Sequence, residues 1–242
     1  KFTSKVYKLK DAYKKLSVPQ FTIVTGFFII CLGTLILSSP LCSSSKVGLW
    51  EAFFTSTSAI TVTGLTIIDI GTDLNFFGQV FLAFMLLSGG LGLMAITTFL
   101  QGFVVKGTKL RTRLDKGKTL DEFGVGGIGR TFQSIAITAT CIISFGAIVL
   151  FSFGFIGIQN KWERLWVSIF HSISAYNNAG FSLWSNSLQD YRTNVLVNIV
   201  FVFLIVMGGL GWRVIDDIWS NKKNLSYKKL SLHSRLVIRT SL

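Results

Sequence analysis

The sequence predicts an all-α polytopic membrane protein that contains two copies of one helical unit. Half of the 242 residues are apolar and only 14% are charged, whereas a soluble domain averages about a quarter charged residues. Four apolar stretches are near or above the roughly 20 residues that a helix needs to cross a bilayer. These stretches cover approximately 21–37, 76–105, 132–158 and 195–218. We expect one membrane helix at each.

The duplication lies between these stretches. Residues 49–64 align without a gap on residues 165–180, and seven of the sixteen positions are identical. The identities include the tryptophans Trp50 and Trp166, which suit anchors at the membrane surface. The sequence GGLG then occurs in each copy, at 89–92 and 208–211. In the second helix of each copy these small residues would allow close helix packing, or would bend the helix and widen a pore.

The repeats divide the chain into five segments. A basic N-terminal segment precedes two repeated units that are joined by a basic linker, and a basic tail follows that resembles the start of another helix. Their predicted bounds are 1–18 for the N-terminal segment, 19–106 and 131–220 for the repeats, 107–130 for the linker, and 221–242 for the tail.

The positive charges predict the orientation in the membrane. Of the 24 Lys and Arg residues, six lie in 1–15, seven in 106–130 and seven in 213–242, whereas 38–75 and 159–194 together carry four. Cytoplasmic loops carry such an excess, so the N-terminus, linker and tail are expected in the cytoplasm. This division across the membrane argues against a nucleic-acid partner. The opposite side has a net charge of −1, which suits a cation entrance or an ordinary solvated loop.

The first duplicated segment predicts a short helix followed by an exposed stretch of backbone. A half-helix over about 48–60 cannot span the membrane alone, and non-helical backbone at that depth must line a cavity. The β-branched residues that follow the half-helix favour an extended backbone, and Gly64 can adopt positive φ. Carbonyl groups that face such a cavity can replace the hydration shell of an alkali cation. The candidate filter residues are Thr61, Val62, Thr63, Gly64 and Leu65.

The second copy keeps the glycine but changes its neighbours. Backbone carbonyls can still coordinate an ion when the side chains differ, so the same role is expected of this segment. Its candidate filter residues are Asn177, Asn178, Ala179, Gly180 and Phe181. Beyond the first copy, Asp69 could concentrate cations at the outer mouth or could cap the next helix.

These motifs together resemble the membrane subunit of the Ktr/Trk/HKT potassium transporters, and the Ktr branch most closely. The resemblance rests on TVTGL with a downstream aspartate, on YNNAGFS and on the two GGLG motifs. It implies four helix–pore-loop–helix repeats around one pore, so that this chain provides half of a fourfold pseudosymmetric pore. The other two repeats would come from the same polypeptide or from a second chain.

The resemblance also implies a function and partners. The expected function is uptake of potassium, with sodium also a possible transported or coupled ion, through a backbone filter in the plasma (inner) membrane. No enzyme activity and no cofactor are implied. A homodimer and a cytosolic nucleotide-binding regulatory subunit on the basic inner loops are implied partners, besides membrane lipid.

Two other classes of function remain open at this stage. A secondary cation transporter with alternating access would place ionisable residues within its helices, and these are nearly absent. A truncated, non-conducting membrane assembly protein is the third class. The stretch 124–129 (GVGGIG) matches a dinucleotide-binding pattern but lacks the preceding strand, so we interpret it as a hinge. His171 and the three cysteines show no metal-ligand spacing.

Overall fold

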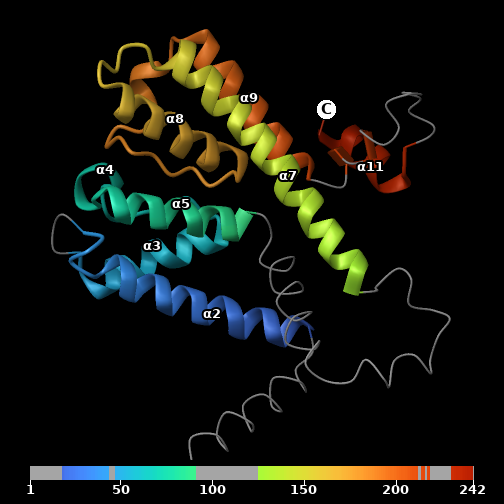
Figure 1. Ribbon diagram of the computed structural model, residues 1–242, viewed down its shortest axis with the longest axis horizontal. Coiled ribbons are helices and arrows are strands. Elements are labelled where there is room, and N and C mark those ends of the chain that lie inside the picture. The colour runs from blue at the N-terminus through green and yellow to red at the C-terminus, as the bar shows by residue number, and fades with distance from the viewer. Residues whose placement is uncertain are drawn as a thin grey trace, which may run out of the picture.

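A computed structural model of the chain describes residues 18–43, 47–90, 125–211, 214–215, 217–218 and 230–241. These residues form helices and connecting segments (Figure 1), and their one β-type pairing is an isolated bridge between Ser43 and Leu74. The longer helices are α2 (Val18–Leu37), α3 (Leu49–Thr61), α5 (Phe76–Gly90), α7 (Val125–Val149), α8 (Lys161–Tyr176), α9 (Val195–Leu210) and α11 (Leu232–Ser241). The shorter ones are α4 (Ile70–Asp73), the π-helix η3 (Leu150–Gly154) and the 3₁₀ helix η4 (Gln189–Tyr191).

The first unit consists of α2, α3 and α5, each in contact with the other two. Gly33 allows α2 to approach closely, because a Cβ atom there would meet the end of the Met85 side chain on α5 and the Ser56 hydroxyl, 3.1 Å away on α3. The N-terminus of α3 is capped by Glu51, whose carboxylate accepts a hydrogen bond from Gly48 N, as in the return bond of a capping box.

The second unit repeats this arrangement with α7, α8 and α9. Asn160 caps α8, since its Oδ1 accepts from Trp162 N at 3.0 Å, and Asn194 caps α9 by accepting from Val197 N at 3.2 Å. Such side chains satisfy backbone donors that the first helical turn leaves free. The π-helix η3 extends α7 and is closed by a bond from Phe155 N to Leu150 O at 2.8 Å.

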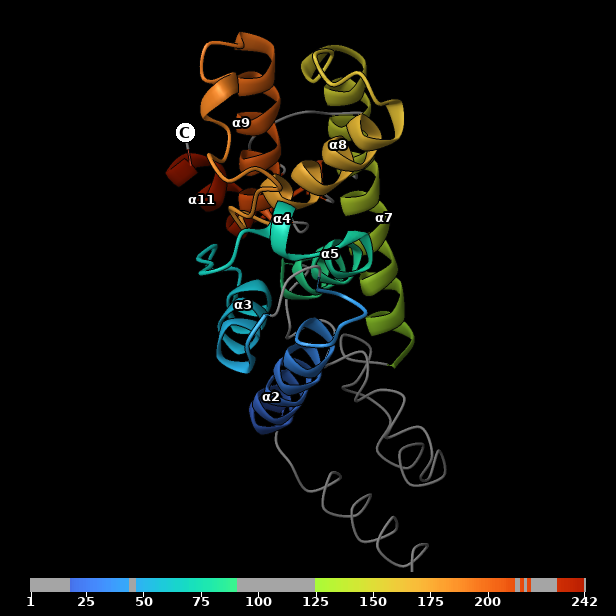
Figure 2. The ribbon, with the colours of Figure 1, turned by 90° about the vertical axis from the view of Figure 1, so that its left-hand side faces the viewer.

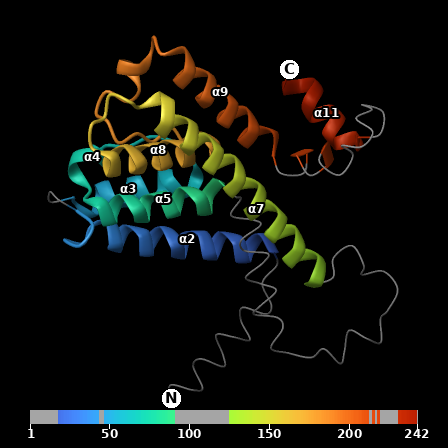
Figure 3. The same cartoon turned by 45° about the horizontal axis from the view of Figure 1, so that its top comes forward.

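The two units meet where α5 packs against α8. Figures 1 and 3 place these helices next to each other, with α2 and α3 on one side and α7 and α9 on the other. The short α4 lies at this junction in Figure 2. There Gly71 approaches the carbonyl oxygen of Leu183 so closely that a Cβ atom would clash with it. The units are therefore joined by helix packing and by their connecting segments.

The structure confirms a helical region at each of the four apolar stretches. Among the described residues, Gln133–Gly154 is long and apolar enough to cross a membrane. Three shorter apolar helices accompany it, at Ile23–Leu37, Phe76–Gly90 and Val195–Leu210. The expected continuation of the second stretch, 91–105, falls outside the described residues. A helix also forms in the tail, at Leu232–Ser241.

Two expectations about helix boundaries were wrong. The stretch 124–129 was interpreted as a hinge, but Val125 begins α7 and the residues through Gly129 are helical. The fourth apolar stretch was expected to be continuous to residue 218, but α9 ends at Leu210 because Gly211 adopts a φ of +77°. Hydropathy is continuous across that glycine, so it gave no sign of the break.

The GGLG motifs bring the second helix of each unit against the half-helix. A Cβ atom on Gly89 would meet the carbonyl oxygens of Ala59 (2.8 Å) and Ile60 at the end of α3, and one on Gly208 would overlap the Tyr176 carbonyl oxygen at the end of α8. Close packing, rather than a bend, therefore explains these two glycines. The position expected for the second motif was wrong, because it ends α9 instead of lying within it.

This contact predicts opposite effects for two adjacent glycines of α9. Gly208→Ala should lower the free energy of unfolding by about 1–3 kcal/mol or more, because the new methyl group meets fixed backbone. Gly209→Ala is the matched control, since its Cβ atom would meet only Asn178 Nδ2, at 3.9 Å. It should be neutral or gain up to about 1 kcal/mol from helix propensity. Thermal unfolding in detergent measures both, and equal destabilisation would contradict this explanation.

Candidate functional site

Both half-helices end in the same hydrogen-bonded turn. In the first unit Val62 N donates to Ala59 O (3.4 Å) and Thr63 N to Ser58 O (2.9 Å). In the second, the residues 116 positions later repeat these bonds, from Asn178 N to Ala175 O at 3.0 Å and from Ala179 N to Ser174 O at 2.8 Å. This is the Schellman pattern, in which the residue after the helix is left-handed. The sequence duplication is thus also a duplication of backbone geometry.

The left-handed residue itself differs in kind between the two turns. Asn178 has a φ of +55°, which asparagine tolerates. Val62 has a φ of +56°, which is a genuine outlier for a β-branched residue. We expected Thr61 and Val62 to be extended, and this was wrong, because Thr61 completes α3 and Val62 forms the left-handed turn. The surrounding bonds hold the backbone in a conformation that costs about 1–3 kcal/mol.

The predicted filter glycines adopt the conformation expected of them. Gly64 has a φ of +83° and Gly180 a φ of +72°, where side chains are rarely accommodated. They also face each other, since a Cβ atom on Gly180 would lie 3.7 Å from the Cα atom of Gly64. A Cβ atom on Gly64 would overlap the carbonyl oxygen of Ala179. The structure therefore brings 61–65 and 177–181 together.

The hydrogen bonds also fix the direction of several carbonyl groups. In a trans peptide the C=O group of one residue points opposite to the N–H group of the next. Because Thr63 N and Leu65 N both point back to Ser58, the carbonyls of Val62 and Gly64 point away from α3. The bond from Ala179 N to Ser174 O similarly directs the carbonyl of Asn178 away from α8.

A matched serine ties each segment to its half-helix. Ser58 Oγ accepts from Leu65 N at 3.0 Å, whereas Ser174 Oγ donates to Phe181 O at 2.7 Å. Both serines are buried, and both bonds span seven residues. The two segments are thus held at the same place through different atoms. The sequence match at Ser58 and Ser174 could have revealed this pair, but sequence reasoning gave it no role.

The C-terminal end of the second segment is held by His171, another residue whose role sequence reasoning missed. Its Nδ1 atom donates to Val167 O at 2.8 Å, because a carbonyl oxygen only accepts. In the neutral ring Nε2 then accepts from Ser182 Oγ at 3.1 Å, and Ser182 Oγ in turn accepts from Trp184 N at 3.1 Å. The imidazole also stacks on Trp184, with 4.4 Å between ring centroids. His171 therefore holds Ser182 and Trp184, which follow the second segment, against α8.

An aromatic cluster continues from His171 toward the loop between α8 and α9. Tyr191 stacks on Trp184 at 5.2 Å between centroids, and Phe155 packs edge-on against Tyr191 at 4.9 Å. Burial, and secondarily the nearby carboxylate of Asp190, raise the pKa of the Tyr191 phenol above its ordinary value. The phenol is therefore neutral at physiological pH. The first unit has no matching cluster among its described residues, because Thr55 replaces the histidine there.

Asp69 lies at the junction of the two units. Its Oδ1 atom accepts from Gly71 N (3.0 Å) and Thr72 N (3.3 Å), which caps α4, and its Oδ2 atom accepts from the Ser185 hydroxyl. Of the two roles considered from the sequence, capping is the one that these bonds describe. The carboxylate also joins the connecting segments of the two units, a contact that sequence reasoning did not foresee.

The two tryptophans of the repeat have different surroundings. Trp166 is half-buried between the units, where its Nε1 atom donates to Gln79 Oε1 at 2.7 Å and its ring packs against Phe76 at 5.0 Å. Trp50 is 81% exposed, and its role as an anchor at the membrane surface stays a prediction. For Trp166 the expectation of an anchor was incomplete, because its indole connects α8 to α5.

The indole–amide bond predicts coupled effects on stability. Gln79→Leu leaves the indole N–H without an acceptor and should cost about 1–3 kcal/mol. Trp166→Phe should also destabilise, but the double variant should cost less than the sum by roughly 0.5–3 kcal/mol. Trp162→Phe, at an 80% exposed tryptophan of the same helix, is the control. Thermal unfolding provides the measurement, and strictly additive costs would contradict the bond.

Comparisons with known proteins identify the family of this chain. The family described as TrkH, cation transport protein, matches residues 4–241. The chain is 32% identical over 228 residues to Ktr system potassium uptake protein B of Bacillus subtilis, a match that covers 94% of this chain and 50% of that protein. It is 29% identical over 227 residues to the Vibrio alginolyticus protein of the same name, covering 91% and 48%.

A third relative carries a broader name. The chain is 34% identical over 233 residues to potassium/sodium uptake protein NtpJ of Enterococcus hirae, covering 95% of this chain and 51% of that protein. The chain thus spans about half the length of these relatives. Because the family match extends over nearly all 242 residues, the chain belongs to the TrkH family of cation transport proteins.

Proposed function

We propose that this chain forms two of the four walls of a potassium filter and takes part in passive uptake of potassium across the plasma membrane. The observation that carries the proposal is the meeting of the two repeated segments, with Gly64 and Gly180 at positive φ and 3.7 Å between the Gly64 Cα atom and a Cβ position on Gly180. Homologues named for potassium and for potassium/sodium uptake support a cation as the substrate.

The proposed chemistry is replacement of ion hydration by backbone carbonyl groups. The carbonyls of Val62, Gly64 and Asn178 point away from their half-helices and would face the ion. Each half-helix would add the negative end of its dipole at the same place. No covalent step is involved, so selectivity would depend on how firmly hydrogen bonds and packing hold these carbonyls.

Two segments cannot enclose an ion, so the proposed pore needs two more of the same kind. Sodium as a transported or coupled ion, a homodimer and a cytosolic nucleotide-binding regulatory subunit are further parts of the proposal, supported by resemblance to the Ktr proteins. The proposed orientation places the N-terminus, the 107–130 linker and the tail in the cytoplasm, where most of the Lys and Arg residues would then lie.

The two glycines should differ in sensitivity, and this tests the filter. Gly180→Ala adds left-handed strain of about 1–2 kcal/mol, while its new methyl group meets only Gly64 Cα, at 3.7 Å. Gly64→Ala adds the same strain and also a clash with the Ala179 carbonyl.

Potassium-over-sodium selectivity should therefore fall about tenfold, corresponding to 1.4 kcal/mol, with Gly180→Ala and further with Gly64→Ala. The measurement is uptake of both ions in cells that depend on this transporter. Unchanged ion preference with normal expression in both variants would argue against a filter.

The charge distribution provides an independent test of orientation. A cysteine in place of Ser187, which is exposed between α8 and α9, should react with a membrane-impermeant thiol reagent in intact cells. A cysteine in place of Thr119 in the linker should react only after the cells are opened. The opposite pattern would contradict the proposed orientation.

A further inference from the structure

We propose that two side chains of α8, His171 and Ser174, are positioning residues that end the ion-coordinating part of the second filter segment. Ser174 turns the carbonyl group of Phe181 away from the ion, and His171 holds the next residue, Ser182, so that this orientation is kept. We call the pair the α8 clamp. The inference rests on the proposed function, because it gives the clamp a part in the potassium selectivity of that filter.

The first half of the clamp is the hydrogen bond from Ser174 Oγ to the carbonyl oxygen of Phe181, at 2.7 Å. Both residues are 3% exposed, so water does not compete for the bond. In a trans peptide the C=O group and the following N–H group point in opposite directions, so the N–H group of Ser182 points away from α8. An N–H group cannot coordinate a cation. The ion-facing carbonyls of the second segment therefore end at or before Gly180.

The second half of the clamp holds the residue that follows this carbonyl. His171 precedes Ser174 by three residues on α8, a spacing that places two side chains on the same face of a helix. Its Nε2 atom accepts from the Ser182 hydroxyl at 3.1 Å, and that hydroxyl also accepts from Trp184 N at 3.1 Å. The peptide between Phe181 and Ser182 is therefore held against α8 at both of its ends.

Aromatic rings keep the imidazole of His171 in place. Trp184 stacks on it, and the rings of Phe155 and Phe170 lie edge-on to it, each with 5.9 Å between centroids. Phe201 adds a fourth ring, from α9, at 6.3 Å. The side chain is enclosed so fully that His171 is 1% exposed. Because close packing leaves it no space to rotate, its Nε2 atom stays directed at Ser182.

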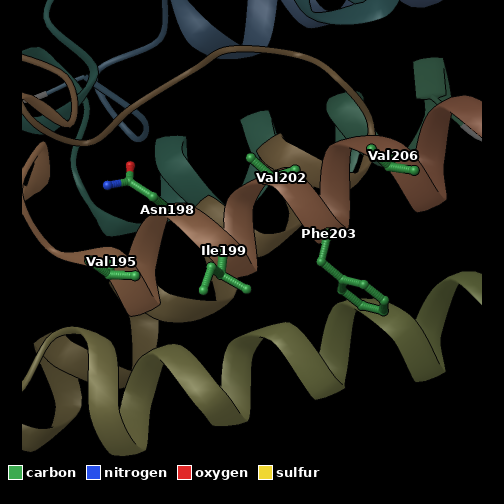
Figure 4. Close-up of a pocket in the computed structure, with 6 residues that line it drawn as sticks. All are labelled: Val195, Asn198, Ile199, Val202, Phe203 and Val206. Carbon is green, nitrogen blue, oxygen red and sulfur yellow. The ribbon is translucent and has the colours of Figure 1, made fainter. Parts of the chain in front are cut away.

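The helix that supplies Phe201 is itself anchored. Figure 4 shows Phe203 reaching from α9 toward α7, where its ring lies edge-on to that of Phe145 with 5.8 Å between centroids. The chain just beyond α7 supplies Phe155, at the end of the π-helix η3. Every group that builds or supports the clamp thus belongs to the second unit.

The described residues of the first unit align on the clamp but do not form one. Thr55 replaces His171, and its hydroxyl is buried without a hydrogen-bond partner. Thr66, which aligns on Ser182, accepts from Ile68 N at 3.2 Å but donates its proton to Ile68 O at 2.9 Å, not to the half-helix. The clamp is therefore a property of the second wall of the proposed filter, and Thr55 provides a matched control.

Ion selectivity tests the clamp in the transporter to which this chain contributes, in cells that depend on it for potassium uptake. Ser174→Ala should lower potassium-over-sodium selectivity several-fold, because the carbonyl group of Phe181 is released and the end of the segment loosens. His171→Phe keeps a ring in the aromatic cluster but cannot accept from Ser182, and should lower selectivity to a similar extent. Thr55→Val removes only a buried hydroxyl that has no partner, and should leave selectivity unchanged.

Two further variants separate positioning from a general loss of stability. The double variant of His171→Phe and Ser182→Ala should lose no more selectivity than either single variant, since both changes remove the same hydrogen bond. His171→Gln should regain part of the selectivity, because its amide oxygen can accept from Ser182. The amount of each variant in the membrane is measured alongside uptake. Should His171→Phe fail to reach the membrane, Ser182→Ala alone provides the same test.

A merely structural role would reduce uptake of both ions in the same proportion. That result for Ser174→Ala and His171→Phe, or an equal change of selectivity with Thr55→Val, would overturn the clamp. The glycine variants distinguish this failure from that of the filter. If Gly64→Ala and Gly180→Ala alter ion preference while the clamp variants do not, the filter stands and the clamp fails. If only the clamp variants alter it, the clamp stands and the assignment of the filter to the glycines fails.

Discussion

Backbone packed directly on backbone holds the candidate filter together. The space that a side chain on Gly64 would occupy is filled by the carbonyl group of Ala179. The position of the first segment is therefore set partly by the second. Behind them, Gly89 and Gly208 let α5 and α9 reach the carbonyl ends of the two half-helices. Because protein interiors are close-packed, a single methyl group at these contacts must displace backbone.

The two repeats are equivalent in backbone but not in support. Ser58 holds an N–H group of its segment and Ser174 holds a carbonyl group. Behind the second segment stand His171 and Trp184, whose rings stack at 4.4 Å. The first segment instead packs against the second repeat, where Gly64 contacts the carbonyl group of Ala179. The two walls of the proposed filter would therefore differ in rigidity and respond unequally to the same substitution at Gly64 and Gly180.

The sequence predicted the features that depend on local backbone chemistry. The half-helices, the positive φ of both glycines and their repetition followed from a gapless alignment. The sequence could not show that Val62 would be left-handed, because a β-branched residue prefers an extended backbone. Hydrogen bonds to α3 decide the conformation instead. The sequence also could not pair Trp166 with Gln79, which is 87 residues away and lies outside the aligned stretch.

The contact between Gly64 and Ala179 has a consequence for the order in which the protein folds. A β-branched residue disfavours the φ of +56° that Val62 adopts. The space beside Gly64 is filled by Ala179, which is synthesised more than a hundred positions later. The hydrogen bonds that hold Val62 to α3 form within the first repeat, whereas the contact of Gly64 with Ala179 forms only when the second repeat docks. The close packing of the candidate filter should therefore be completed late in folding, after the two repeats have docked.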